Sequence, residues 1–220
     1  MTVCGRYTLY HDEQDLTELF ELDAFAWAPR YNIAPTQTVP IVRLGRDGRE
    51  RLDARWGLVP AWVKEPGTFK ALLFNARSET VGEKPSFRDA ARSARCVVPA
   101  SGFYEWRAED GGKRPYYVHR RDGAPMALAG LYAERPRGEP ARSATILTTE
   151  PNELMATLHD RMPVVLEADA FARWLDPDTR DVGELADLLR PVASELLEAY
   201  PVDRAVGDAR LDEARLIQRV

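Results

Sequence analysis

The stretch RCVVPASGFYEW, residues 95–106, decides the fold because it opens a series of four apolar segments. The other three are PYYVHRR (115–121), PMALAGLYAE (125–134) and SATILTT (143–149). The segments recur about every ten residues and are rich in the β-branched and aromatic residues that strands favour. Short turns containing glycine, such as DGGK (110–113), separate them. Because such turns join antiparallel neighbours, we expect antiparallel strands curled toward a barrel.

The rest of the chain predicts further strands and peripheral helices. VPIVRL (39–44) and RERLDARWGLV (49–59) flank the turn GRDG and predict a hairpin. Helices are expected at residues 12–22, 85–94, 151–159, 168–175 and 182–190. Further strands are expected at 4–10 and 161–167, and a loop at 27–38. The fold class is therefore α+β, a single domain over residues 1–220 with a barrel-like antiparallel sheet and peripheral helices.

Composition restricts the class of protein. The chain has 220 residues, 45% of them hydrophobic and 30% charged, and no apolar stretch approaches the roughly 20 residues that span a bilayer. A basic leader is absent, so we expect a cytoplasmic protein. Two cysteines are too few for a disulfide framework or a cysteine-based metal site, and we expect no metal and no cofactor. A net charge of -5 argues against binding nucleic acid over the whole surface, but not in a local basic groove.

The two cysteines differ in their surroundings. Cys96 sits in an apolar run and is expected in the core. Cys4 lies near the chain end in MTVCGRYTLY, where a structural cysteine is unusual. A nearby arginine or histidine would activate its thiol, whereas the alternative is an idle cysteine on a frayed end. The strand expected after it makes idle fraying the weaker alternative.

Three further residues are candidates for chemistry. Glu105, between Tyr104 and Trp106, would be a general acid or base if buried, although strand alternation alone favours a solvated side chain. His159 would shuttle protons or simply cap a helix. Asn75, after the apolar residues LLF, is either a structural bridge or a group that orients a substrate.

Several long motifs in one order resemble the SOS-response-associated peptidase family, also called abasic-site processing proteins. They are CGRYTL (4–9), YNIAPTQ (31–37), WGLVPAW (56–62), NARSET (75–80), RCVVPASGFYEW (95–106), PYYV (115–118), AGLY (129–132), ILTTEPN (146–152) and HDRMPV (159–164). Chance agreement over motifs of this length and order is very improbable. The resemblance covers nearly the whole chain.

The resemblance implies a sensor of abasic sites in single-stranded DNA that forms a covalent DNA–protein crosslink. An N-terminal cysteine amine would condense with the sugar aldehyde, and the thiol would then close a thiazolidine that shields the lesion. Carried over by motif, Cys4 is the nucleophile, Asn75 holds it and the sugar, Glu105 handles protons, and His159 assists ring opening. This lyase-like activity needs no obligate protein partner, and we expect a monomer.

The same resemblance implies a DNA groove. The matching motifs predict phosphate and sugar contacts from Arg6, Asn32, Arg77, Thr148 or Thr149, and Arg161. Trp62 and Phe69, in the loop between two motifs, would stack on bases or wedge beside them, with core packing as the alternative for Trp62.

The sequence departs from the family at its start, because Met1, Thr2 and Val3 precede the cysteine. A thiazolidine requires amine and thiol on one residue. Three explanations follow: trimming of residues 1–3, for example by self-cleavage; a start codon nearer Cys4; or function without processing. We favour trimming, because the other matched catalytic positions are intact. The alternative functions are a cysteine peptidase, general or only self-processing, using Cys4 with His159 as base, and a non-covalent binder of single-stranded DNA.

Overall fold

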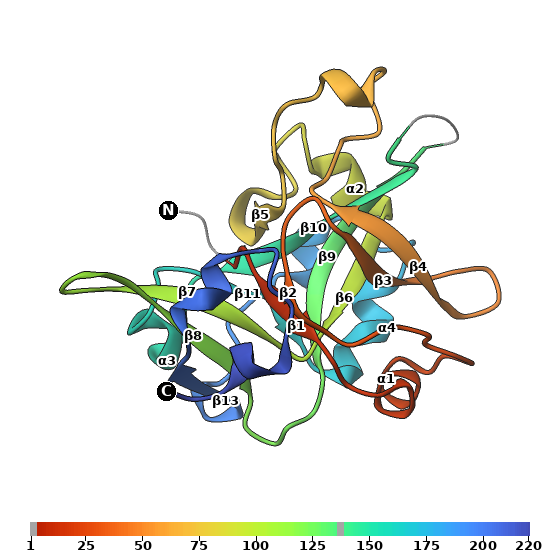
Figure 1. Ribbon diagram of the computed structural model, residues 1–220. Coiled ribbons are helices and arrows are strands. Elements are labelled where there is room, and N and C mark those ends of the chain that lie inside the picture. The colour runs from red at the N-terminus through yellow and green to blue at the C-terminus, as the bar shows by residue number, and fades with distance from the viewer. Residues whose placement is uncertain (1–3, 136–138) are drawn as a thin grey trace.

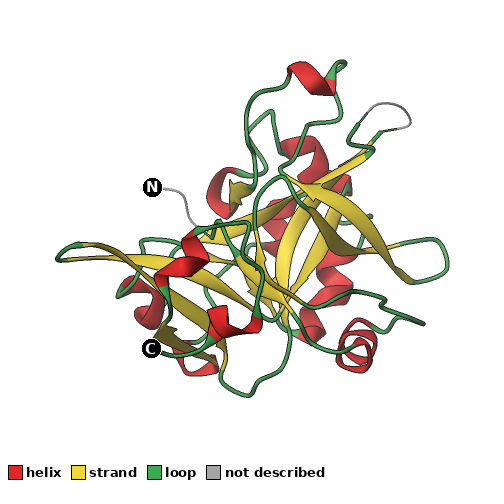
Figure 2. Cartoon of the chain, viewed as in Figure 1, coloured by secondary structure: helices red, strands yellow, loops and turns green. Residues whose placement is uncertain are grey.

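The computed structural model describes residues 4–135 and 139–220. Its strands are β1 (Tyr7–Leu9), β2 (Arg30–Ile33), β3 (Thr38–Leu44), β4 (Arg49–Trp56), β5 (Asn75–Arg77), β6 (Arg95–Ala100), β7 (Gly102–Glu109), β8 (Gly112–Arg120), β9 (Met126–Glu134), β10 (Arg142–Thr149), β11 (Met162–Pro163), β12 (Val165–Leu166) and β13 (Leu197–Pro201). The α-helices are α1 (Glu13–Phe20), α2 (Arg88–Ser93), α3 (Glu153–Ala156) and α4 (Phe171–Leu175). In Figure 2 the helices lie around the outside of the strands.

Five strands close into a barrel. The pairing runs β10–β4–β3–β6–β9 and returns to β10, with β4 and β10 parallel and the other joints antiparallel. The fully buried side chains of Ile41, Val97, Leu128 and Ile146 belong to its large apolar core. The predicted α+β class with a barrel-like antiparallel sheet is confirmed.

A second sheet carries β13–β8–β7–β1–β2 in that order. A smaller apolar cluster, which includes Tyr104, Tyr117 and Val206, packs the last turns of the chain against it. In Figure 1 these blue C-terminal turns cross in front of the red first strand, so the two ends of the chain meet on this sheet. The β7–β8 hairpin extends beyond β1.

The two sheets meet where the stretch at 95–106 breaks. We expected one strand there, but a bend at Ser101 separates β6 in the barrel from β7 in the second sheet. The Ser101 N–H bonds the Thr8 carbonyl, at 2.6 Å, instead of continuing the barrel ladder. A Cβ on Gly102 would lie 2.5 Å from the Tyr117 hydroxyl, so only glycine fits directly after the bend.

The structure confirms some local predictions and corrects others. The hairpin β3–β4 forms around the GRDG turn, and α1 begins at Glu13 because Asp12 caps it by accepting the Asp15 N–H. The expected helix at 182–190 is wrong, because only a 3-10 turn forms at Val182–Leu185. The expected loop at 27–38 contains β2, and the expected strand at 161–167 is divided into β11 and β12.

Candidate functional site

Cys4 lies directly before β1 and is fully buried, with a left-handed φ of 41°. Its backbone N–H donates to Glu105 Oε2 at 2.9 Å. Burial, and then the nearby Glu105 carboxylate, raise the pKa of its thiol well above the ordinary value. The frayed-end alternative is therefore wrong, and at neutral pH the thiol keeps its proton until a base removes it.

Glu105 lies on β7 and is 2% exposed, so the interpretation of a solvated side chain is also wrong. Burial raises the pKa of its carboxyl to about 7, although the N–H groups of Cys4 and Trp106 stabilise the carboxylate. A group with this pKa exchanges a proton readily at neutral pH, as a general acid or base must.

His159 is positioned by the turn that ends α3. Asn152 caps that helix by accepting the Met155 N–H, and the His159 N–H bonds the Met155 carbonyl at 2.8 Å. The imidazole is 3% exposed, and its Nε2 lies 3.8 Å from Glu105 Oε1. Burial lowers the pKa of the ring, which favours a neutral imidazole beside the carboxyl.

Asn75 begins β5, which adds a short parallel segment to β10 with Asn75 opposite Ile146. The residue is half-buried. On the same two strands, Arg77 pairs with Thr148. Arg77 is exposed, whereas Thr148 and Thr149 are 2% and 4% exposed, so of these three only the arginine reaches far into solvent.

A pocket of about 300 Å³ opens over the acid and the histidine. It is lined by Glu105, Trp106, Lys113, His159 and Gly207. Lys113, from the β7–β8 hairpin, and Gly207, from the C-terminal turns, are residues that the sequence analysis did not anticipate. The predicted hairpin at DGGK is the one sequence signal that could have drawn attention to Lys113, while no local pattern distinguishes Gly207.

Arg6 and Asn32 join the C-terminal turns to the second sheet. Arg6 donates to the Val206 carbonyl at 2.7 Å and to Asn32 Oδ1 at 3.3 Å. Asn32 is fully buried, and its amide donates to the carbonyls of Val206, Asp208 and Leu211. The Asn32 side chain is therefore not accessible to DNA. It would act on the predicted groove only by holding Arg6 in place.

Arg161 is held by two partners. Its Nη2 donates to Glu79 Oε2 at 2.8 Å and to the Thr148 carbonyl at 2.6 Å. These bonds connect the turn after His159 to the NARSET motif and to β10. The guanidinium is thereby fixed beside the strand pair that carries Asn75 and Arg77.

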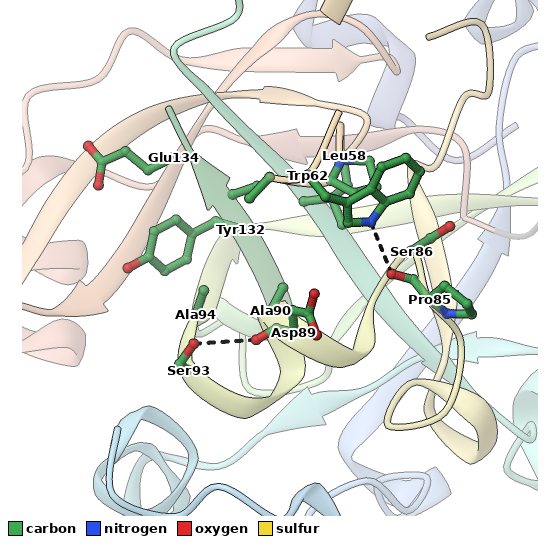
Figure 3. A pocket seen from close by; sticks show the side chains of 13 residues that line it. Leu58, Trp62, Pro85, Ser86, Asp89, Ala90, Ser93, Ala94, Tyr132 and Glu134 are labelled. Atoms are coloured by element: carbon green, nitrogen blue, oxygen red, sulfur yellow. Dashed lines mark hydrogen bonds between the residues drawn. The ribbon is translucent and has the colours of Figure 1, made fainter. Parts of the chain in front are cut away.

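Trp62 is 56% exposed on the long loop between β4 and β5, so the alternative of core packing is wrong for its indole. Its N–H donates to the Pro85 carbonyl at 3.2 Å, and Phe69 packs edge-on against it with 6.4 Å between ring centroids. Figure 3 shows the indole above a second pocket, of about 260 Å³, formed by this loop, α2 and β9. Figure 1 shows the loop projecting from the barrel.

Residues 4–135 and 139–220 contain neither a metal-binding cluster nor a membrane-spanning helix. Within these ranges no cluster of three or more His, Cys, Asp or Glu side chains is arranged to hold a metal ion. None of the helices described is long and apolar enough to cross a membrane.

Comparisons with known proteins agree with the motifs. The family model described as "SOS response associated peptidase (SRAP)" matches residues 3–209. "Abasic site processing protein YoqW" of Bacillus subtilis (strain 168) is 39% identical over 224 residues, covering 98% of this chain and 99% of that protein. "Abasic site processing protein HMCES" of Gallus gallus is 33% identical over 241 residues, covering 94% of this chain and 71% of that protein.

The fold has a matching crystal structure. A protein from Bacteroides thetaiotaomicron superposes with a TM-score of 0.83 at 26% identity, covering 99% of this chain and all of that one. The resemblance drawn from the motifs is thereby confirmed. The chain belongs to the SOS response associated peptidase family.

Proposed function

We propose that this protein processes abasic sites in single-stranded DNA by forming a covalent crosslink through Cys4. The observation that carries the proposal is the 2.9 Å contact between the Cys4 nitrogen and Glu105, an acid that lines a pocket together with His159. The nitrogen and sulfur of one residue thus lie beside a buried acid with a pKa of about 7. The substrate is taken from the relatives, which are named abasic site processing proteins.

The proposed reaction has three steps. The sugar of the abasic site opens to an aldehyde, with His159 assisting the proton transfers. The Cys4 amine attacks the aldehyde carbon, and the carbinolamine hydroxyl takes a proton from Glu105 and leaves as water, giving an iminium ion. The Glu105 carboxylate then takes the proton of the thiol, and the sulfur bonds the same carbon, closing a thiazolidine whose nitrogen keeps one hydrogen.

The remaining predicted residues position the DNA. Asn75 would hold the sugar, while Arg77 and Arg161 would contact phosphates beside it. Arg6 and Thr149 would contribute to the same groove, Arg6 with its Asn32 support. Trp62, with Phe69 packed on it, would stack on or wedge beside bases.

The proposed chemistry requires a free amine on Cys4. Residues 1–3, whose trimming we proposed, lie outside the described residues. In the translated chain the Cys4 nitrogen is an amide, which is not a nucleophile. Removal of residues 1–3 therefore belongs to the proposal as its first step, by the protein itself or by another peptidase.

Covalent capture is favoured over a general cysteine peptidase. Such an enzyme relies on a thiolate beside an imidazolium. Here burial raises the pKa of the Cys4 thiol and lowers that of the His159 ring, so both groups are uncharged at neutral pH. In the proposed reaction a base removes the proton of this neutral thiol, and the sulfur then adds to the iminium carbon.

The test is crosslinking of protein purified from its native host to a single-stranded oligonucleotide with one abasic site. A band that survives denaturation, lost in Cys4→Ala and retained in Cys96→Ala, is the expected result. Intact mass of the same sample should show Cys4 as the first residue. Binding without a denaturation-resistant band would instead identify a non-covalent binder, and no binding would overturn the proposal.

A further inference from the structure

Asp160 lies at the exposed side of the site and has no part in the chemistry proposed above. Its side chain is 83% exposed, and its Oδ1 lies 2.7 Å from His159 Nδ1. The adjoining imidazole is 3% exposed. Asp160 is therefore the point where the buried histidine meets solvent.

Four groups form a line from the centre of the site to this surface. The Cys4 nitrogen contacts Glu105 Oε2 at 2.9 Å, Glu105 Oε1 faces His159 Nε2 at 3.8 Å, and His159 Nδ1 contacts Asp160 at 2.7 Å. The first three groups are buried and the fourth is exposed. The 3.8 Å step is too long for a direct hydrogen bond, and a small rotation or a hydroxyl of the opened sugar would close it.

The reaction proposed above needs a route by which a proton can leave the buried site. A free α-amine has a pKa near 7.7–8.0, so much of it is protonated at neutral pH. Ammonium, thiol and aldehyde give a thiazolidine, one water and one proton. That proton is released at a fully buried cysteine, from which it must reach solvent for the crosslink to accumulate.

We propose that Asp160 is the solvent end of a proton path that runs from Cys4 through Glu105 and His159. The inference rests on the proposed function and adds to it a positioning residue that acts through His159. Asp160 Oδ1 lies 2.7 Å from His159 Nδ1, closer than the Arg161 backbone nitrogen, whose N–H also points at Nδ1 from 3.2 Å. In the proposed path the carboxylate replaces that weaker bond and holds the proton on Nδ1, so the Nε2 lone pair faces Glu105 as an acceptor. It then stabilises the imidazolium that forms when Nε2 takes the proton.

Other charges around the imidazole also influence the path. Glu105 faces it from β7 and Lys113 from β8, while the neighbouring Arg161 is paired with Glu79. Asp160 raises the pKa of both Glu105 and His159, and Lys113 lowers both. Removing the Asp160 carboxylate therefore shifts both ionisations toward lower pH.

Asp160→Asn and Asp160→Ala test the path. The asparagine oxygen still accepts from Nδ1–H but takes no proton, whereas alanine loses both roles. Asp110→Asn, at the exposed tip of the β7–β8 hairpin, is the charge-matched control. We measure the crosslinking rate of processed protein between about pH 5 and 8, with and without added formate as a diffusible proton carrier.

The expected result is a crosslinking rate about tenfold lower in Asp160→Asn. This is the lower end of the loss in activity when a metal-ligating histidine loses its carboxylate partner, about 10- to 100-fold. Formate should restore part of that rate, the pH profile should move toward lower pH, and noncovalent DNA binding should not change. Equal rates for parent and Asp160→Asn at every pH would overturn the path. So would a slowing that formate leaves unchanged. Absence of any crosslink in the parent would instead overturn the proposed function itself.

Discussion

Glu105 accepts the backbone N–H of Cys4 across 101 positions of sequence, in a contact that is buried on both sides. The same carboxyl titrates near neutral pH because burial disfavours its charge. Burial of this carboxyl thus couples the ionisation of the site to the stability of the fold.

Stability should fall as this carboxyl ionises. The pKa of Glu105 is about 7 in the folded protein against 4.5 unfolded, so the folded state binds its proton more tightly. The free energy of unfolding should therefore lose about 3 kcal/mol from this group as pH rises from below 4.5 to above 7. Glu105→Gln removes the effect, and the difference between the two urea-denaturation curves measured across pH gives the contribution. A difference independent of pH would show that Glu105 is not buried as described.

Substitution of Glu105 should also slow crosslinking. Glutamine keeps the contact to the Cys4 nitrogen but supplies no proton to the carbinolamine hydroxyl. We expect a loss of about 100-fold in the crosslinking rate, measured by time-resolved denaturing gels at neutral pH. Glu109→Gln, further along β7, is the control, and an equal loss there would contradict a specific role for Glu105.

Trp62→Ala should weaken DNA binding without unfolding the protein. The indole is 56% exposed, so its removal should change the free energy of unfolding by less than about 0.5 kcal/mol. Loss of one stacking platform should cost about 1–3 kcal/mol of affinity for single-stranded DNA, measured by fluorescence anisotropy at fixed salt. Leu72→Ala, on the same loop and 47% exposed, should leave affinity unchanged. Equal effects of the two variants would remove the argument for stacking.

Asn32→Ala should loosen the C-terminal turns. The variant removes the amide donor from the Val206, Asp208 and Leu211 carbonyls, of which Val206 keeps only Arg6, and it leaves Arg6 without one acceptor. We expect a loss of about 3 kcal/mol in the free energy of unfolding, seen as a lower Tm. Gln218→Ala, at an exposed position near the same end, should leave the Tm unchanged. An unchanged Tm for Asn32→Ala would show that those carbonyls find water as readily as the amide.

Gly102→Ala should be strongly destabilising. The added Cβ would lie 2.5 Å from the Tyr117 hydroxyl and 2.6 Å from the Val118 carbonyl, and the second of these is backbone that moves only with β8. We expect about 3 kcal/mol of lost stability by chemical denaturation. Gly67→Ala, where a Cβ meets nothing within 4 Å, should have little effect.

Local sequence patterns predicted the elements that interactions between near neighbours in the chain stabilise. The GRDG turn predicted β3 and β4, and the amphipathic spacing of Leu16, Leu19 and Phe20 predicted α1. The bend at Ser101 was not predictable, because its cause is a bond to Thr8, a residue distant in sequence. The parallel joint between β4 and β10, which closes the barrel, likewise depends on contacts across some 90 positions.

The site was predicted unevenly for the same reason. Cys4, Glu105 and His159 were identified through motifs, yet residue pattern alone favoured a solvated Glu105 and left His159 open. Burial of these side chains results from the meeting of two sheets and the C-terminal turns. Lys113 and Asp160 act on the site through space, and no periodicity in the sequence marks them.

The contact of Arg6 with Val206 and Gly207 has a consequence for the timing of activity. Chains are synthesised from the N-terminus, so Cys4 is made well before Gly207, which lines the pocket. A nascent chain therefore carries Cys4 before the C-terminal turns can fold onto the second sheet. The pocket over Glu105 and His159 is complete only when segments made far apart in time have come together.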